Sequence, residues 1–461
     1  MKTDDLAVSD RQKKTVRWVV AIAAVALIFD GYDLVVYGTV VSTLLNDPSQ
    51  LGAMDAAQAG ALGSYALMGV MVGALVTGAF GDYIGRRRVL ITGIIWFSLG
   101  MGLTAMAPDV LTFGLLRFLT GLGVGALVAT AGAVVAEFAP VGRRNFYNAI
   151  VYSGVPAGGV LASLLAIVLG DVVGWRGLFW IGALPILFLF PMALFKLPES
   201  PQWLLARGRA DEAHAVSART GVPLVLPVTM QSTPGVVAKA ERVGFSALAT
   251  KRYALPTALL GMMSFSGLLL TYGLNTWLPA IMNQFGYGKT FSLTFLLVLN
   301  AGAIIGGLIA SISADRFGPK CVVSTTFFLA AVAMILMTIN LPFAVLLALV
   351  AVAGVGTIGT QVLIYGFVSN YYESHARGAG VAWCAGFGRL GGIFGPLVGG
   401  FLLAAGVQNH VAFYVFAGVA IAGSIVTMFV RHSRQAVTVV IPRTSAADKQ
   451  PADVAVRVTV P

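Results

Sequence analysis

Long apolar segments, separated by short polar or charged ones, follow one another along most of the chain. A helix of about 20 mainly apolar residues is long enough to cross the hydrocarbon core of a bilayer. Twelve segments of this kind are predicted, at approximately 18–44, 57–80, 89–107, 110–138, 145–169, 175–195, 254–284, 290–314, 322–339, 342–370, 378–405 and 410–430. The pattern therefore predicts an all-α membrane protein that crosses the bilayer twelve times.

The charged residues are few and unevenly placed. They make up 11% of the 461 residues, whereas 57% are apolar, and the net charge is +11. A basic chain can be a nucleic-acid binder, but here all but four of the Lys and Arg residues fall in the tails and alternate loops. This is the positive-inside asymmetry, which predicts that both termini lie in the cytoplasm. The four exceptions are Arg176 and Lys289 in external loops, and Arg117 and Arg389 inside spans.

The spans divide into two sets of six. The predicted organisation is an N-terminal half (1–195), a cytoplasmic linker (196–253), a C-terminal half (254–430) and a disordered cytoplasmic tail (431–461). In the linker, Ser200 is expected to cap a short helix that has Pro201 at its first position. The loop Gly81–Arg88 in the first half has a counterpart, Asp315–Lys320, in the second, with the same Asp-x-x-Gly spacing. Two parallel repeats predict two halves that rock about a site near mid-membrane.

Two carboxylates interrupt the first span. Asp30 and Asp33 lie three residues apart, so their side chains share one face of a helix. Ionisable groups at this depth are costly, and they face a cavity or a charged partner rather than lipid. The pair is predicted to couple transport to protons, because such acids can take up a proton outside and release it inside. A purely structural salt bridge to an arginine is the alternative for either residue.

The two arginines inside spans are candidates for binding an anion. Arginine presents a planar fork that fits a carboxylate through two hydrogen bonds. Arg389 lies among glycines that allow a ligand to approach closely, whereas Arg117 has the alternative of pairing with the acids of the first span. Polar or aromatic residues at similar depth include Tyr37, one turn beyond Asp33. The others are Tyr272, Asn275, Trp277, Tyr365 and Trp383. Of these residues, Tyr37, Asn275 and Trp277 are predicted to bind the substrate together with the two arginines.

Charged residues at the cytoplasmic ends of the helices are predicted to form a gate that breaks as the halves rock. Topology-setting charges with no gating role are the alternative. The predicted gating residues are Gly81, Asp82, Gly85, Arg86, Glu137, Arg143, Asp315 and Arg316.

Several of these motifs resemble the major facilitator superfamily. Gly81–Arg88 is similar to its loop signature between the second and third helices, and Arg117–Gly125 to its fourth-helix signature. Asp30-Gly31-Tyr32-Asp33 resembles the first-helix signature of the aromatic acid:proton symporters. The runs Phe29–Gly38 and Tyr272–Pro279 are most similar to the benzoate-transporting branch. The resemblance covers nearly the whole chain apart from the linker and tail, and implies the major facilitator fold in a bacterial cytoplasmic membrane.

The function expected from these features is proton-coupled import of a small aromatic carboxylate, benzoate or a hydroxybenzoate-like acid. The alternatives are a sugar or organic-acid symporter, a drug:proton antiporter and a non-transporting receptor. The Gly391–Gly400 run resembles the antiporter motif but lies in the eleventh span rather than the fifth. No P-loop pattern is present, so ATP is not expected to drive transport directly. We expect no enzyme activity, no cofactor, no metal and no nucleic-acid partner. The protein is expected to act as a monomer.

Overall fold

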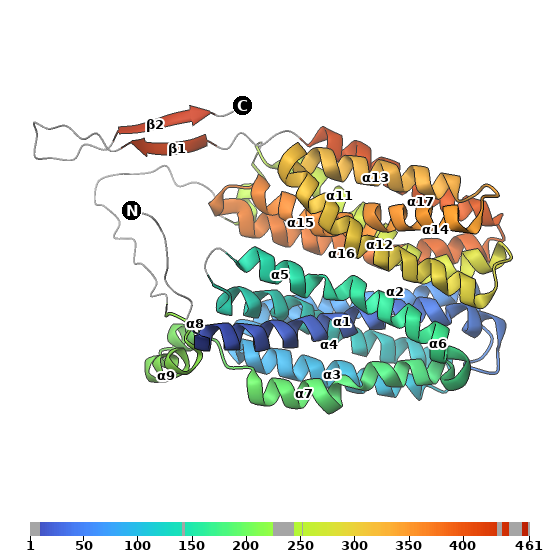
Figure 1. Cartoon of the computed structure of the whole chain (residues 1–461), viewed down its shortest axis with the longest axis horizontal. Helices are drawn as coiled ribbons and strands as arrows, with labels where there is room; N and C mark the ends of the chain where they lie inside the picture. The colour runs from blue at the N-terminus through green and yellow to red at the C-terminus, as the bar shows by residue number, and fades with distance from the viewer. Residues whose placement is uncertain are drawn as a thin grey trace, which may run out of the picture.

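The computed structural model describes residues 10–140, 143–224, 244–250, 252–430, 436–441 and 454–459. Nearly all of this part is helical, and its long helices run roughly side by side along one axis (Figure 1). The first half of the chain contains α1 Asp10–Asn46, α2 Ala56–Ile84, α3 Arg86–Ala105, α4 Val110–Phe138, α5 Arg144–Tyr152, α6 Gly154–Ala183 and α7 Pro185–Lys196. The linker contains α8 Pro201–Ala206, α9 Ala210–Thr220 and α10 Phe245–Leu248. The second half contains α11 Ala254–Gln284, α12 Lys289–Phe317, α13 Pro319–Leu336, α14 Phe343–Gly354, the π-helical turn η1 Val355–Gly359, α15 Thr360–Tyr371, α16 Ser374–Ala404 and α17 Asn409–Phe429.

Eleven helical segments of the described part are long and apolar enough to cross a membrane. Where the sequence predicts separate spans at 145–169 and 175–195, one segment of 51 residues runs from Phe146 to Lys196. At 1.5 Å per residue, a straight helix of that length would measure roughly 76 Å, far more than the roughly 30 Å of hydrocarbon. The segment breaks at Gly174, which has a φ of 64° and lies between the two predicted spans.

The two parts of this long segment contact different helices. Before the break, Gly158 packs so closely on α1 that an added Cβ would lie 1.9 Å from the Ile28 carbonyl oxygen. After the break, Gly182 packs on α3, where an added Cβ would lie 2.2 Å from the Met101 methyl group. The chain therefore turns at Gly174, and each part occupies its own place in the bundle.

The repeated Asp-x-x-Gly spacing has a structural reason. Gly85 separates α2 from α3 with a φ of 103°, and Gly318 separates α12 from α13 with a φ of 84°. Both conformations lie in the region that favours glycine. The two loops therefore turn in the same way at matching places in the two halves.

The halves form two bundles that meet along three helix pairs, α1 with α11, α2 with α16, and α6 with α12. Glycines allow the close approach. A Cβ added at Gly38 would lie 1.9 Å from the Asn275 carbonyl oxygen. One added at Gly60 would lie 2.6 Å from the Pro396 carbonyl oxygen. Ser64 adds a hydrogen bond of 2.6 Å to the carbonyl oxygen of Ile393.

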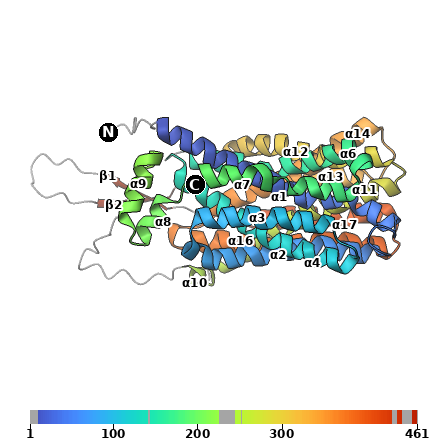
Figure 2. The same ribbon diagram turned by 90° about the horizontal axis from the view of Figure 1, so that it is seen from below.

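These contacts between the halves share one end of the bundle. Gly38 and Ile393 lie in the parts of α1 and α16 that are far from the linker helices α8 and α9, which extend beyond the opposite end (Figures 1 and 2). Lys289 and Asp171, at the same far end, form an exposed ion pair of 2.5 Å between the halves. The halves are thus joined at the end away from the linker.

The start of the linker is held against the first half. Ser200 caps α8 as predicted, because its side chain accepts a hydrogen bond of 3.1 Å from the Trp203 backbone. Arg87 donates hydrogen bonds of 2.7 Å to the carbonyl oxygens of Leu197 and Leu194. The second linker helix, α9, was not predicted. The Pro-containing middle of the linker lies mostly outside the described residues.

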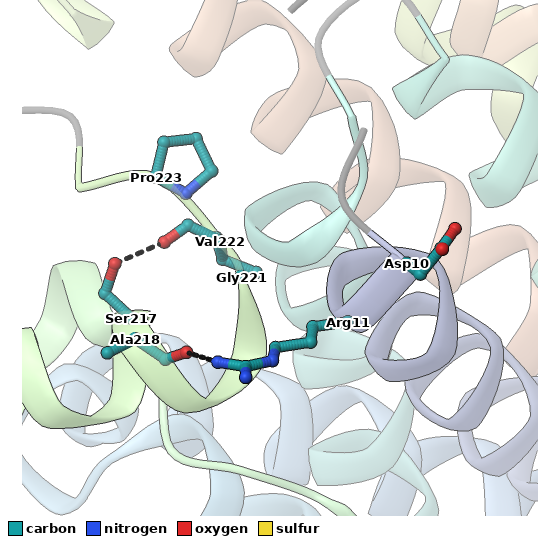
Figure 3. Close-up of a pocket in the computed structure, with 7 residues that line it drawn as sticks. All are labelled: Asp10, Arg11, Ser217, Ala218, Gly221, Val222 and Pro223. Atoms are coloured by element: carbon teal, nitrogen blue, oxygen red, sulfur yellow. Dashed lines mark hydrogen bonds between the residues drawn. The ribbon is translucent and has the colours of Figure 1, made fainter. Parts of the chain in front are cut away.

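A surface pocket of about 610 Å³ lies between the start of α1 and the end of α9. Arg11 reaches across it and donates a hydrogen bond to the carbonyl oxygen of Ala218 (Figure 3). This contact fastens the first helix to the linker. The pocket is open to solvent and far from the acids of the first span.

The tail differs from the disordered segment expected from the sequence. Two short strands, β1 Ala436–Ile441 and β2 Val454–Thr459, pair in antiparallel register, with Ala436 opposite Thr459. Both strands are rich in valine, a β-branched residue with a high preference for strands. The rest of the tail lies outside the described residues.

Candidate functional site

Asp33 and Arg117 form an ion pair between α1 and α4. Arg117 Nη1 donates to Asp33 Oδ1, and Nη2 lies 3.4 Å from the Asp33 carbonyl oxygen. The Asp33 side chain is 0% exposed and that of Arg117 is 1% exposed. Removing one member of such a pair would leave an uncompensated charge in the interior.

Aromatic rings contact the guanidinium of Arg117. Its central carbon lies 5.6 Å from the ring centroid of Tyr37 and 5.7 Å from that of Phe179, distances at which cation–π attraction operates. The Tyr37 hydroxyl donates a hydrogen bond of 2.6 Å to the Ala59 carbonyl oxygen. Arg117 is therefore held between Asp33 and these rings. This arrangement favours the pairing role that was the alternative to substrate contact.

Asp30 has a different environment. Its side chain is 3% exposed, and its Oδ1 has no hydrogen-bond partner among the described residues, as is also true of Asp33 Oδ2. What distinguishes Asp30 is that, within the described part, it forms no ion pair. The charged groups that interact with it electrostatically are Asp33, on its own helix, and Arg389, on α16 of the other half. The two acids of the first span therefore interact with different arginines, Asp33 through an ion pair and Asp30 through electrostatics alone.

Arg389 is the other arginine inside a predicted span. It is half-buried, and within the described part of the chain its guanidinium forms neither a hydrogen bond nor an ion pair. Small neighbours bring other helices close to its own: an added Cβ at Gly388 would lie 2.2 Å from Ser264 Oγ, and one at Gly392 would lie 2.8 Å from the Tyr272 ring. The arrangement leaves a partly accessible cation with five donors available to an anion.

Three tyrosines lie within electrostatic range of Arg389. Tyr152 comes from α5, Tyr272 from α11 and Tyr365 from α15. All three are half-buried. Together with Asp30, these residues from both halves have hydroxyl and carboxylate groups that interact electrostatically with one guanidinium. Tyr272 and Tyr365 were identified in the sequence by depth alone, and Tyr152 was missed because it lies close to a predicted span end.

Three residues predicted to bind substrate have structural contacts in this conformation. Besides Tyr37, Trp277 is fully buried and donates its single N–H to the Pro396 carbonyl oxygen at 2.7 Å. Asn275 donates a hydrogen bond of 2.7 Å to the Thr271 carbonyl oxygen and accepts one of 2.9 Å from Asn300. In this conformation, the polar atoms of these side chains are engaged within the protein.

The predicted gating residues lie at the end of the bundle that carries the linker. Arg86 Nε lies 2.7 Å from Glu137 Oε1, so this pair joins α3 to α4 within the first half. Arg143 is exposed just before α5, and Gly81 and Gly85 flank the end of α2. In the second half, Asp315 and Arg316 lie in the last turn of α12. The side chain of Asp82 lies outside the described part.

Comparison with known proteins agrees with this architecture. Residues 19–313 and 298–456 match the model of the Major Facilitator Superfamily. The chain is 31% identical to the benzoate transport protein of Acinetobacter baylyi, over 93% of this chain and 92% of that protein. It is 34% identical to the gentisate transporter of Corynebacterium glutamicum, over 85% of this chain and 82% of that protein.

Solved structures show the same fold at low sequence identity. The xylose transporter of Escherichia coli in a partially occluded, inward-open conformation matches with a TM-score of 0.69 and 15% identity, over 90% of this chain and 100% of that one. The family and the relatives are membrane transporters, not enzymes. This chain is therefore a multi-pass membrane protein that belongs to the major facilitator superfamily.

Proposed function

We propose that the protein is a proton-coupled symporter that imports a small aromatic carboxylate, of the benzoate or hydroxybenzoate type, by alternating access. The observation that carries this proposal is Arg389, a half-buried guanidinium without a hydrogen-bond or ion-pair partner in the described part. An arginine inside a membrane span is stabilised by an opposite charge, so Arg389 is expected to bind an anion. Relatives that transport benzoate and gentisate make an aromatic carboxylate the favoured anion.

The proposed topology has twelve crossings. The break at Gly174 divides the segment from Phe146 to Lys196 into two crossings, which adds one to the eleven helical segments. Basic residues concentrate at the end that carries the linker, so this end is assigned to the cytoplasm of a bacterium, with both termini. The contacts between Gly38 and Asn275 and between Ser64 and Ile393 then seal the external end. The conformation described here is accordingly proposed to face inward.

The charges in the core account for coupling. Asp30, Asp33, Arg117 and Arg389 sum to zero when all are ionised. A substrate carboxylate on Arg389 adds one negative charge and deprives Asp30 of the cation that stabilises its charge. A proton on Asp30 restores neutrality. One proton and one monoanion would therefore cross the low-dielectric core together at lower electrostatic cost than either alone.

The opening and closing of the cytoplasmic end is proposed to involve the charged loops. The Arg86–Glu137 pair lies within the first half in this inward-facing state. We propose that Asp82, Arg143, Asp315 and Arg316 form ion pairs when the halves close on that side. A monomer suffices for this cycle, because both halves belong to one chain.

Uptake by purified protein in lipid vesicles tests the proposal. Labelled benzoate and 4-hydroxybenzoate should accumulate when the outside is more acidic than the inside, and only equilibrate without a gradient. The R389K variant should lose most of its apparent affinity, because lysine cannot form the planar two-bond contact. R209K, in the exposed linker pair with Glu212, is the matched control and should behave as wild type. Uptake of sugars, efflux of drugs or ligand binding without uptake would each replace the proposal with another function.

A further inference from the structure

The surroundings of Arg389 hold more hydrogen-bonding groups than a carboxylate needs. Arg389 alone can satisfy both oxygens of a carboxylate. The hydroxyls of Tyr152 and Tyr272 make no hydrogen bond to any described residue, and Asp30 Oδ1 has no partner either. An unsubstituted aromatic ring offers these groups nothing to bind.

These groups reach the site from both halves. Tyr272 belongs to the second half, and its ring packs on Gly392, three residues beyond Arg389 on α16. Tyr152 belongs to the first half. Its hydroxyl lies against α4, 2.6 Å from where a Cβ at Gly132 would be. Packing therefore places Tyr272 beside the anchor of a ligand held by Arg389, and Tyr152, with which Arg389 interacts electrostatically, belongs to the other half.

The third tyrosine is better supported by its neighbours. Tyr365 lies beside Gln361 and Ser264. Gln361 Nε2 donates to Ser264 Oγ at 3.1 Å, and Ser264 in turn contacts Gly388, next to Arg389. Tyr365 is thus positioned by a polar cluster behind it. This leaves Tyr152 and Tyr272 as the hydroxyls free to meet a ligand.

We propose that the site selects aromatic acids that carry a ring hydroxyl over unsubstituted ones, with Arg389 on the carboxylate and Tyr152 and Tyr272 on the ring hydroxyl. This inference rests on the proposed function and narrows its substrate class. A phenolic hydroxyl both donates and accepts hydrogen bonds. It can therefore donate a hydrogen bond to Asp30 or to one tyrosine while accepting one from the other tyrosine. Benzoate would leave the same groups without a partner on the ligand. Sites built to bind a hydroxyl discriminate strongly against analogues that lack it.

The test compares ligands that differ only in ring hydroxyls. Benzoate, 3-hydroxybenzoate, 4-hydroxybenzoate and 2,5-dihydroxybenzoate compete for uptake into vesicles, and their binding to detergent-purified protein is measured by thermal shift. At least one hydroxylated acid should bind about tenfold or more tightly than benzoate. Y152F and Y272F should each reduce that ratio several-fold while leaving benzoate affinity nearly unchanged. Y65F, on α2 with a partly exposed ring, should keep the wild-type ratio.

Equal or tighter binding of benzoate by the wild type would overturn the inference. So would phenylalanine variants that weaken benzoate and the hydroxylated acids to the same degree. The outcome is separable from that of the proposed function. Transport of benzoate in preference to all hydroxylated acids refutes the hydroxyl selection alone, whereas a protein that binds none of the four acids refutes both.

Discussion

Arg117 and Asp33 join α4 to α1 through an ion pair that is closed to solvent. Three residues earlier on α1, Asp30 forms no ion pair within the described part, and the cation that acts on it electrostatically is Arg389. Two acids on one helical face are thus assigned to two arginines. We infer that the Asp33–Arg117 pair positions α1 and that Asp30 is the acid that exchanges the proton.

Replacing one member of the buried Asp33–Arg117 pair should destabilise the protein more than replacing both. Asp33→Asn or Arg117→Gln leaves one buried charge without its partner, which typically costs about 3–5 kcal/mol. The double variant should recover a large part of the lost stability, since no unpaired charge remains. Thermal unfolding of the detergent-purified variants, followed by fluorescence-detected size exclusion, measures this. A double variant less stable than both single variants would contradict the pairing role.

Asp30→Asn should uncouple transport from protons. An amide cannot take up the proton, so accumulation driven by a pH gradient should fall at least tenfold, while exchange of labelled for unlabelled substrate continues. Uptake and exchange in the same vesicles measure the two processes. Full gradient-driven accumulation by Asp30→Asn would remove Asp30 from the coupling mechanism.

Asp109→Asn provides a control for the pH dependence. Asp109 lies outside the spans, where hydrogen bonds from the Thr112 backbone and side chain lower the pKa of its carboxyl. A lowered pKa means that the stabilising charge is present above the unfolded-state value and is lost only as the pH falls through the folded-state value. Between pH 5 and 7 this cap stays ionised. Asp109→Asn should therefore keep the wild-type pH profile of uptake, whereas Asp30→Asn should flatten it.

A side chain at Gly38 should prevent the external end from closing. An added Cβ would lie 1.9 Å from the Asn275 carbonyl oxygen, so Gly38→Val is compatible only with a state in which α1 and α11 separate. Transport should be lost, and a cysteine placed in the external half of α11 should react faster with an impermeant reagent. Gly418→Val is the control, because nothing lies within 4 Å of that position. Unchanged transport by Gly38→Val would contradict the assigned seal.

The Arg86–Glu137 pair should affect turnover more than binding. Its members lie 2.7 Å apart at the end of the bundle that carries the linker, away from Arg389. Glu137→Gln should reduce the maximal uptake rate several-fold and leave the apparent affinity within about twofold. Kinetics of uptake over a range of substrate concentrations separate the two parameters. A change confined to affinity would place Glu137 near the substrate instead.

Most of the fold could be predicted from the sequence, because the apolar length of each helix and the charge of each loop can be read one segment at a time. The predicted division near residue 174 matches the break at Gly174, and the repeated Asp-x-x-Gly loops match the turns at Gly85 and Gly318. The valine-rich strands of the tail were missed because its overall polarity outweighed their local preference.

The site was harder to predict, because pairing between helices depends on three-dimensional packing. Asp30, Asp33, Arg117 and Arg389 can be identified from the sequence, because ionisable groups inside membrane spans are energetically unfavourable and therefore rare. The sequence does not show which acid interacts with which arginine. Trp277 and Asn275 are of the residue types, and lie at the predicted depth, expected of ligand-binding residues. Their polar atoms nevertheless form hydrogen bonds within the protein. Tyr152 lies close to the start of a predicted span, and only the packing of α5 lets it interact electrostatically with Arg389.

Proton movement during substrate entry tests the central claim most directly. Vesicles that contain the purified protein and a pH-sensitive dye, with no imposed gradient, receive 4-hydroxybenzoate from outside at a pH where it is almost fully ionised. The interior should acidify at the rate of labelled uptake in the wild type, and Asp30→Asn should take up substrate without that acidification. Substrate entry in the wild type with no change in internal pH would contradict proton-coupled import.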